Sequence, residues 1–132
     1  MLTWPTILLA LMVCREVPRE PAYVQHAVAQ TVLNRVAHPG WWGHDIPSVI
    51  LTPYQYSTMT APGDPQLTQW PTSQAWSRCV DSAQDVLNLA VPIVAPGADS
   101  FYATTIPAPE WATKDRFVVQ IGRLKFYNMD GR

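Results

Sequence analysis

The sequence predicts an α+β domain that is mostly helical, with a small antiparallel β-sheet near its C-terminus. Three stretches carry apolar residues at helical spacing, and they end by residues 17, 38 and 89. Residues 117–127 alternate between apolar and polar side chains around a glycine, which is typical of two strands joined by a tight turn. The length of 132 residues suits one hydrophobic core, so we expect a single domain over residues 1–132.

The first predicted helix is apolar on all sides, which is typical of a buried helix. Thr3 is a suitable N-cap, and Pro5 falls in the first turn, where proline is tolerated. Pro18 ends the helix at Val17 or before. Residues 2–14 are too few to span a bilayer, which takes about 20 residues, and no basic segment precedes them. We therefore expect a core helix, and neither a signal peptide nor a membrane anchor.

The second predicted helix begins near Pro21, repeats valine every four residues and stops at Pro39-Gly40. Residues 41–71 are irregular and rich in proline, although residues 48–51 are suited to a short helical turn. An irregular segment of this length is unusual in a compact domain and is often functional.

Thr72 or Ser73 caps the third predicted helix, which extends to about residue 89. Residues 100–104 favour a strand. If Gly122-Arg123 forms a hairpin loop, the two flanking strands have one apolar face. That face should consist of Phe117, Val119, Ile121, Leu124 and Phe126. The other face should carry Val118, Gln120, Lys125 and Tyr127.

Charge and residue spacing argue against two kinds of partner. The formal net charge is −1 and no basic run occurs, so we expect no nucleic-acid partner. The three histidines show none of the spacings that are typical of metal sites, and we expect no metal and no other cofactor. Cys14 and Cys79 lie on apolar helical patterns and are interpreted as small buried side chains, although their pairing stays open.

Glu16 stands near the end of the first helix, and Glu20 follows in the junction to the second. Burial raises the pKa of a carboxyl group, which would make Glu16 a candidate proton donor near neutral pH. From position alone, two solvated charges in a helix–helix turn are the alternative. Gln55-Tyr56-Ser57 is a polar and aromatic cluster suited to hydroxyl and acetamido groups, although a plain loop is equally compatible with it. Aromatic rings can also pack on the flat apolar faces of sugars.

Several short motifs occur in a recognisable order along nearly the whole chain. They are Arg15-Glu16-x-x-x-Glu20-Pro21, Val32-Leu33-Asn34-Arg35-Val36, Gln55-Tyr56-Ser57, Ser100-Phe101-Tyr102, Pro109-Glu110-Trp111 and Gln120-Ile121-Gly122-x-x-x-Phe126-Tyr127. This order resembles the cell-wall hydrolase family of the spore-cortex-lytic enzymes, a domain that phage endolysins also carry. The chain departs from the family pattern at Val17-Pro18-Arg19, between the glutamates, and at Tyr56, where phenylalanine is usual.

The resemblance implies a lysozyme-like fold and cleavage of the glycan strands of peptidoglycan. Glu16 matches the catalytic acid/base of the family, and Glu20 matches a glutamate that supports the site. The substrate-binding residues that it implies are Glu20, Gln55, Tyr56, Ser57, Tyr102, Trp111 and Gln120. Asn34 and Arg35 we interpret as a polar pair that ties down the following loop, in preference to sugar contacts.

The sequence offers no clear second carboxylate for a glycosidase mechanism, which needs two at about 5–5.5 Å or about 6.5–9.5 Å. Asp45 and Asp64 lie in the irregular stretch, outside any motif. We therefore expect a lytic transglycosylase with one acid/base. The alternatives are a hydrolytic muramidase or glucosaminidase and a non-catalytic glycan-binding virion module.

The expected setting follows from the same resemblance. Peptidoglycan glycan strands are the expected partner. The protein should be a monomer that is made in the cytoplasm without a signal peptide and acts on the cell wall after release.

Overall fold

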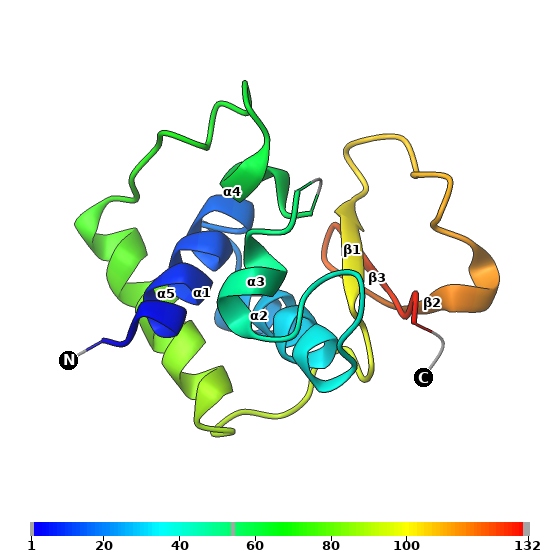
Figure 1. The fold of residues 1–132 in the computed structure, drawn as a ribbon, viewed down its shortest axis with the longest axis horizontal. Helices are drawn as coiled ribbons and strands as arrows, with labels where there is room; N and C mark the ends of the chain where they lie inside the picture. The colour runs from blue at the N-terminus through cyan, green and yellow to red at the C-terminus, as the bar shows by residue number, and fades with distance from the viewer. Residues whose placement is uncertain (1, 54, 131–132) are drawn as a thin grey trace.

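Three long helices form the larger part of the fold in the computed structural model, which describes residues 2–53 and 55–130. They are α1 (Trp4–Glu16), α2 (Ala22–Ala37) and α5 (Ser73–Leu87). Two short helices, α3 (Ile46–Ile50) and α4 (Ser57–Thr60), lie between α2 and α5 in the chain. Helix α1 packs against α5, α3 and α4, while α2 packs against α5 and α3. The strands lie on the opposite side of the molecule from α5 (Figure 1).

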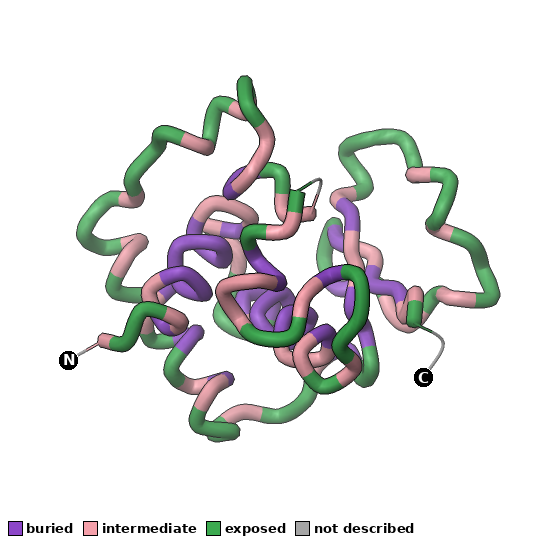
Figure 2. Tube along the Cα trace, viewed as in Figure 1, coloured by how far each residue is buried: buried purple, intermediate pink, exposed green. Residues whose placement is uncertain are grey.

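Helix α1 is the buried helix that its apolar sequence predicts. The Thr3 side chain caps it by accepting a hydrogen bond from the Thr6 backbone, and every residue from Leu8 to Cys14 is buried. The helix ends at Glu16, where the Val17 backbone N–H bonds to the Val13 carbonyl at 2.8 Å. Figure 2 shows buried residues running through α1 and α2 and continuing into the sheet. No helix in the described part of the chain is long and apolar enough to cross a membrane.

The predicted helix boundaries are confirmed to within a few residues. Pro21 is the N-cap of α2, and Thr72 caps α5 through its side chain. The predicted turn at residues 48–51 is α3, whose capping box joins Asp45 and Ser48. Helix α4 was not predicted, because three of its four residues are serine or threonine, which have low helix preference.

The sheet has three antiparallel strands in the order β1-β3-β2, and a short 3-10 helix, η1 (Lys114–Arg116), precedes β2. The strands are β1 (Ser100–Ala103), β2 (Phe117–Ile121) and β3 (Leu124–Tyr127). The predicted hairpin is confirmed, since Ile121 pairs with Leu124 and Val119 with Phe126 around Gly122, whose φ is 58°. Phe126 is fully buried in the main core.

The predicted position of Phe117 is wrong. An irregularity in β2 between Phe117 and Val119 shifts the register, so Phe117 pairs with Tyr127. Such a bulge moves every side chain beyond it to the other face of the strand. The Phe117 and Tyr127 rings accordingly lie 5.6 Å apart, and Phe117 does not join the core face.

Cys14 and Cys79 form a disulfide, with their Cα atoms 5.5 Å apart. Both are buried, as predicted, and they pair, which the sequence left open. The pairing depends on the tertiary structure. Cys14 lies in α1 and Cys79 in α5, and the sequence does not reveal that these helices pack with the two positions facing each other.

Candidate active site

A groove of about 670 Å³ is bounded by the C-terminal end of α1, residues 41–42 and 55–57, and β1 with the loop that follows it. Six of the eight predicted site residues line it. They are Glu16, Gln55, Tyr56, Ser57, Tyr102 and Trp111. Residues from several of the sequence motifs therefore meet in one groove.

Glu16 is half-buried in this groove as the last residue of α1. Burial raises the pKa of the Glu16 carboxyl above its usual value, and the negative charge of Asp64 raises it further. A hydrogen bond from Thr58 Oγ1 to Glu16 Oε1, at 2.9 Å, acts in the opposite direction. Because burial is the largest of these effects, Glu16 retains its proton to a higher pH than a solvated glutamate and can serve as a proton donor.

Replacing Thr58 by valine should shift the pH dependence of activity. The Thr58 hydrogen bond lowers the Glu16 pKa, so its loss should raise that pKa and move the alkaline limb of the pH–rate profile to higher pH. The maximal rate should fall about tenfold, as expected when one hydrogen bond that orients the acid is lost. Thr58→Ser keeps the hydroxyl and is the matched control. An unchanged pH profile for Thr58→Val would show that the hydroxyl does not tune Glu16.

Tyr56 adopts a backbone conformation that is uncommon for a residue with a side chain. Its φ is 44° and it caps α4, so the segment turns sharply just before Ser57. The Tyr56 hydroxyl lies 3.0 Å from Thr31 Oγ1 on α2. The hydroxyl that distinguishes Tyr56 from the phenylalanine of the family pattern is therefore hydrogen-bonded within the protein.

Arg35 is a buried cation next to the groove and positions one of its walls. Its Nε donates to the Asp99 carbonyl at 2.7 Å, and its Nη1 donates to Gln55 Oε1 at 2.9 Å. The guanidinium also lies between two rings, 5.0 Å from the Trp42 centroid and 4.9 Å from the Tyr56 centroid. Because a guanidinium only donates hydrogen bonds, the Gln55 oxygen must face Arg35, and the Gln55 NH₂ remains to donate elsewhere.

The interpretation of Asn34 and Arg35 as a structural pair is confirmed in its main point. Asn34 Nδ2 donates to the Ala98 carbonyl at 2.7 Å. Hydrogen bonds tie the pair to residues 98–100 and, through Arg35, to Gln55, and the Trp42 ring of the loop that follows α2 lies 5.0 Å from the Arg35 guanidinium. Arg35 also lines the groove, which the sequence alone did not indicate.

Aromatic rings form the side of the groove next to the sheet. Tyr102, Trp111 and Tyr127 pack on one another with ring centroids 5.5 to 6.2 Å apart. Trp111 is 37% exposed. Trp41, which the sequence analysis did not single out, also lines the groove and is 71% exposed. Exposed indole rings in one groove suit the apolar faces of sugars.

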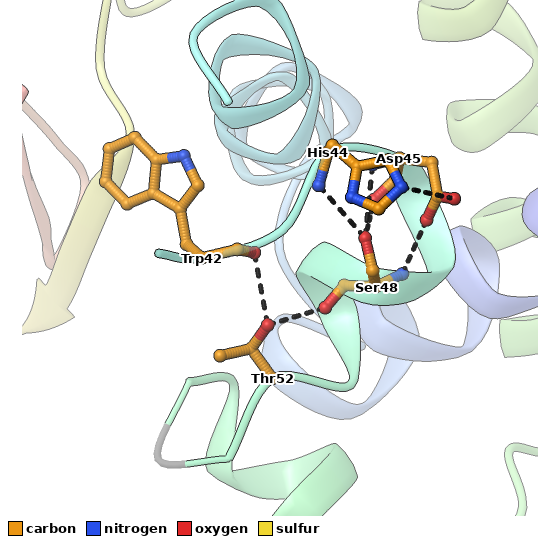
Figure 3. A network of polar contacts seen from close by, with 5 residues as sticks. All are labelled: Trp42, His44, Asp45, Ser48 and Thr52. Carbon is orange, nitrogen blue, oxygen red and sulfur yellow. Dashed lines mark hydrogen bonds and ion pairs between the residues drawn. The ribbon is translucent and has the colours of Figure 1, made fainter. Parts of the chain in front are cut away.

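The loop that carries Trp41 and Trp42 is fixed by polar contacts, and Figure 3 shows those that join Trp42, His44, Asp45, Ser48 and Thr52. Thr52 Oγ1 lies 3.1 Å from the Trp42 carbonyl oxygen, and the Trp42 indole donates to the His38 carbonyl at 2.9 Å. Asp45 accepts from the Ser48 backbone at 2.8 Å and so starts α3. Asp45 is thus a helix cap in an exposed position and does not line the groove.

Two predicted substrate-binding residues, Glu20 and Gln120, do not line the groove. Glu20 forms an ion pair with Arg123 at 2.9 Å and so connects the α1–α2 junction to the β-hairpin. Gln120 is exposed and donates to the Gly122 carbonyl at 3.1 Å. The geometry therefore gives Glu20 a supporting place and does not favour sugar contacts for Gln120.

No second carboxylate lines the groove among residues 2–53 and 55–130. Asp64 is the carboxylate whose charge raises the Glu16 pKa, but its Oδ1 accepts a hydrogen bond from the Gln66 backbone at 2.9 Å within its own loop. The part of the chain that the structure describes also contains no cluster of residues that could hold a metal ion.

A helical part and a small sheet that border a groove with one half-buried glutamate define a lysozyme-like α+β fold, as predicted. The same fold is found in the catalytic domain of the germination-specific lytic transglycosylase SleB from Bacillus anthracis. The TM-score is 0.68 at 22% sequence identity, and the match covers 96% of each chain. Residues 19–127 match the cell wall hydrolase family model. The chain belongs to the cell wall hydrolase family, and the predicted family is confirmed.

A search of curated proteins found no match. The family match begins at Arg19, three residues after Glu16. The assignment of Glu16 therefore depends on its place in the groove and on the glutamate motif, and not on the matched segment.

Proposed function

We propose that this protein cleaves the glycan strands of peptidoglycan, with Glu16 as its acid/base. The observation that carries the proposal is a half-buried glutamate with a raised pKa in a groove that exposed indole rings line. Membership of the cell wall hydrolase family supports the substrate class. The SleB domain, which shares the fold, is a lytic transglycosylase, and this agrees with the proposed reaction.

The groove residues have separate tasks in this proposal. Glu16 donates its proton to the glycosidic oxygen that leaves. Gln55, held by Arg35, directs its NH₂ group toward the acetamido carbonyl of a bound sugar. Trp41 and Trp111 pack against sugar faces, and Ser57 can donate a hydrogen bond from the turn that Tyr56 makes. Each step uses a side chain that the fold already holds in place.

The lack of a second groove carboxylate in the described residues favours transglycosylation over hydrolysis. After the C–O bond breaks, the Glu16 carboxylate takes the proton of the muramic 6-hydroxyl as that oxygen bonds to the anomeric carbon. The products are a 1,6-anhydromuramyl end and a strand with a free hydroxyl, and Glu16 ends the cycle protonated. The substrate supplies the nucleophile, so no water is consumed and one acid/base is enough.

Digestion of peptidoglycan in heavy-oxygen water tests the reaction type. We expect muropeptides with anhydro ends and no incorporated label, as measured by mass spectrometry. A muramidase that hydrolyses the same substrate is the control, because its reducing ends take up the label. Labelled reducing ends without anhydro ends would overturn transglycosylation and direct attention to Asp64 as the second carboxylate.

The biological setting is a further part of the proposal. An endolysin that is made in the cytoplasm and reaches the wall after release stays a prediction, as does the monomeric state. A non-catalytic glycan-binding module is the competing function, and it predicts that the wild type binds glycan strands without cleaving them.

A further inference from the structure

A second groove, of about 390 Å³, shares no lining residue with the first. It is formed by the end of α1, the α1–α2 junction, residues 66–72 and the first turns of α5. Three arginines, Arg15, Arg19 and Arg78, contribute to its lining. The lining also includes Gln69, Gln74 and Trp70, a residue that is 74% exposed.

The three guanidinium groups are not neutralised by carboxylates of the described chain. Among the residues that the structure describes, no ion pair joins any of them to a carboxylate, and no carboxylate lines this groove. Arg15 donates to the Gln69 and Thr58 carbonyls, and Arg78 donates to the Glu20 carbonyl. The charge of Asp64 reaches Arg15, but Asp64 is not part of the lining. Guanidinium groups gathered in this way suit carboxylates, which they can bind through paired hydrogen bonds.

The second groove lies next to the catalytic glutamate. Arg15 lines one groove and Glu16, the next residue, lines the other. Thr58 contacts both charges, because its carbonyl accepts from Arg15 Nη1 at 3.3 Å and its hydroxyl donates to Glu16 at 2.9 Å. A branched polymer whose sugar chain lies at Glu16 can therefore place a side branch at the arginines.

We propose that this arginine groove binds the carboxylates of the peptide stems that peptidoglycan carries on its muramic residues. The inference rests on the proposed function. The glutamines can both donate and accept hydrogen bonds, as peptide groups require, and Trp70 offers an apolar surface to alanine side chains. A phosphodiester polymer would match the arginines alone, so the peptide accounts for more of the lining.

The test compares two substrates and two variants. One substrate is a set of glycan strands with their peptides, and the other is the same strands after an amidase has removed them, both free of phosphodiester polymers. The test variant is Arg19→Gln/Arg78→Gln. The matched control is Lys114→Gln/Lys125→Gln, which makes the same change in charge at residues that line neither groove.

For the wild type we expect kcat/KM to be about tenfold or more higher on peptide-bearing strands, the factor that one charge-assisted hydrogen bond supplies. The Arg19→Gln/Arg78→Gln variant should lose most of that preference and keep the wild-type value on stripped strands, while the lysine control keeps the preference. The single variant Arg19→Gln changes an exposed residue and keeps the hydrogen bond from Arg78 to the Glu20 carbonyl. It therefore separates the loss of a groove charge from any effect of breaking that bond.

Equal rates of the wild type on both substrates, or a variant that keeps the preference, would overturn the inference and leave the proposed function standing. The same holds if both rates fall together, or if a preference appears only when phosphodiester polymers are restored. Failure of the proposed function gives a different result, since neither substrate would then be cleaved.

Discussion

The Glu16→Gln variant should lose lysis of cell walls almost completely and keep its fold. Glutamine has nearly the volume of glutamate but has no acidic proton to donate, and general acid catalysis contributes about 10²–10⁴-fold to rate. We expect a loss of about 10³-fold or more in turbidity clearance, with an unchanged circular dichroism spectrum. The loss should be nearly complete, because the groove has no other carboxylate in the described part of the chain that could donate the proton.

Glu20→Gln is the matched control for that variant. Glu20 lies four residues further on, outside the groove, and its ion pair with Arg123 joins two surface segments. A pair of this kind contributes about 0–1 kcal/mol, so clearance should fall only slightly. Near-normal clearance by Glu16→Gln would remove the assignment of Glu16. Glycan binding that survives without any cleavage in the wild type would instead favour the non-catalytic module.

The features that the sequence predicted well are those that local residues determine. Thr3 and Thr72 cap their helices through their own side chains, and Pro18 and Pro39 end helices through their own backbone restrictions. The hairpin register follows from Gly122, which adopts the positive φ that the turn requires. None of these inferences required knowledge of which helices and strands pack against each other.

The features that it missed depend on contacts between distant segments. The bulge that moves Phe117 depends on how β2 meets β3, and the disulfide depends on how α1 meets α5. The place of Trp41 in the groove was also missed. Trp41 and Trp42 are adjacent in a stretch with proline and glycine, and two neighbouring indoles in such a loop could have indicated a sugar-binding surface.

The candidate site shows the same division. Glu16 could be predicted because it ends a helix that is apolar all round and because the order of motifs matches it to the acid/base of the family, whereas its position alone left two solvated charges as the alternative. The left-handed conformation of Tyr56 could not, since an L-residue rarely adopts it without tertiary support. Arg35 was correctly interpreted as structural, but only the fold shows that it holds Gln55 in the groove.

Removing the disulfide should lower the free energy of unfolding by about 4 kcal/mol. Cys14 and Cys79 are 65 residues apart, and closing a loop of that length restricts the unfolded chain by about this amount. Domains of ordinary size unfold with about 5–15 kcal/mol, so the disulfide would supply a large share of the total. Urea denaturation of the oxidised and reduced protein measures the difference directly.

The Cys14→Ala/Cys79→Ala variant separates the covalent effect from that of the reductant. Its stability should resemble that of the reduced wild type, less a small cost for the sulfur atoms lost from the core, and reductant should have no effect on it. Glu16 follows Cys14 by two residues in α1, and this helix should stay folded until the whole variant unfolds. Clearance activity should therefore fall at the temperature where this variant unfolds and not below it. Free thiols in the native wild type, or identical urea midpoints with and without reductant, would contradict a structural role for the bond.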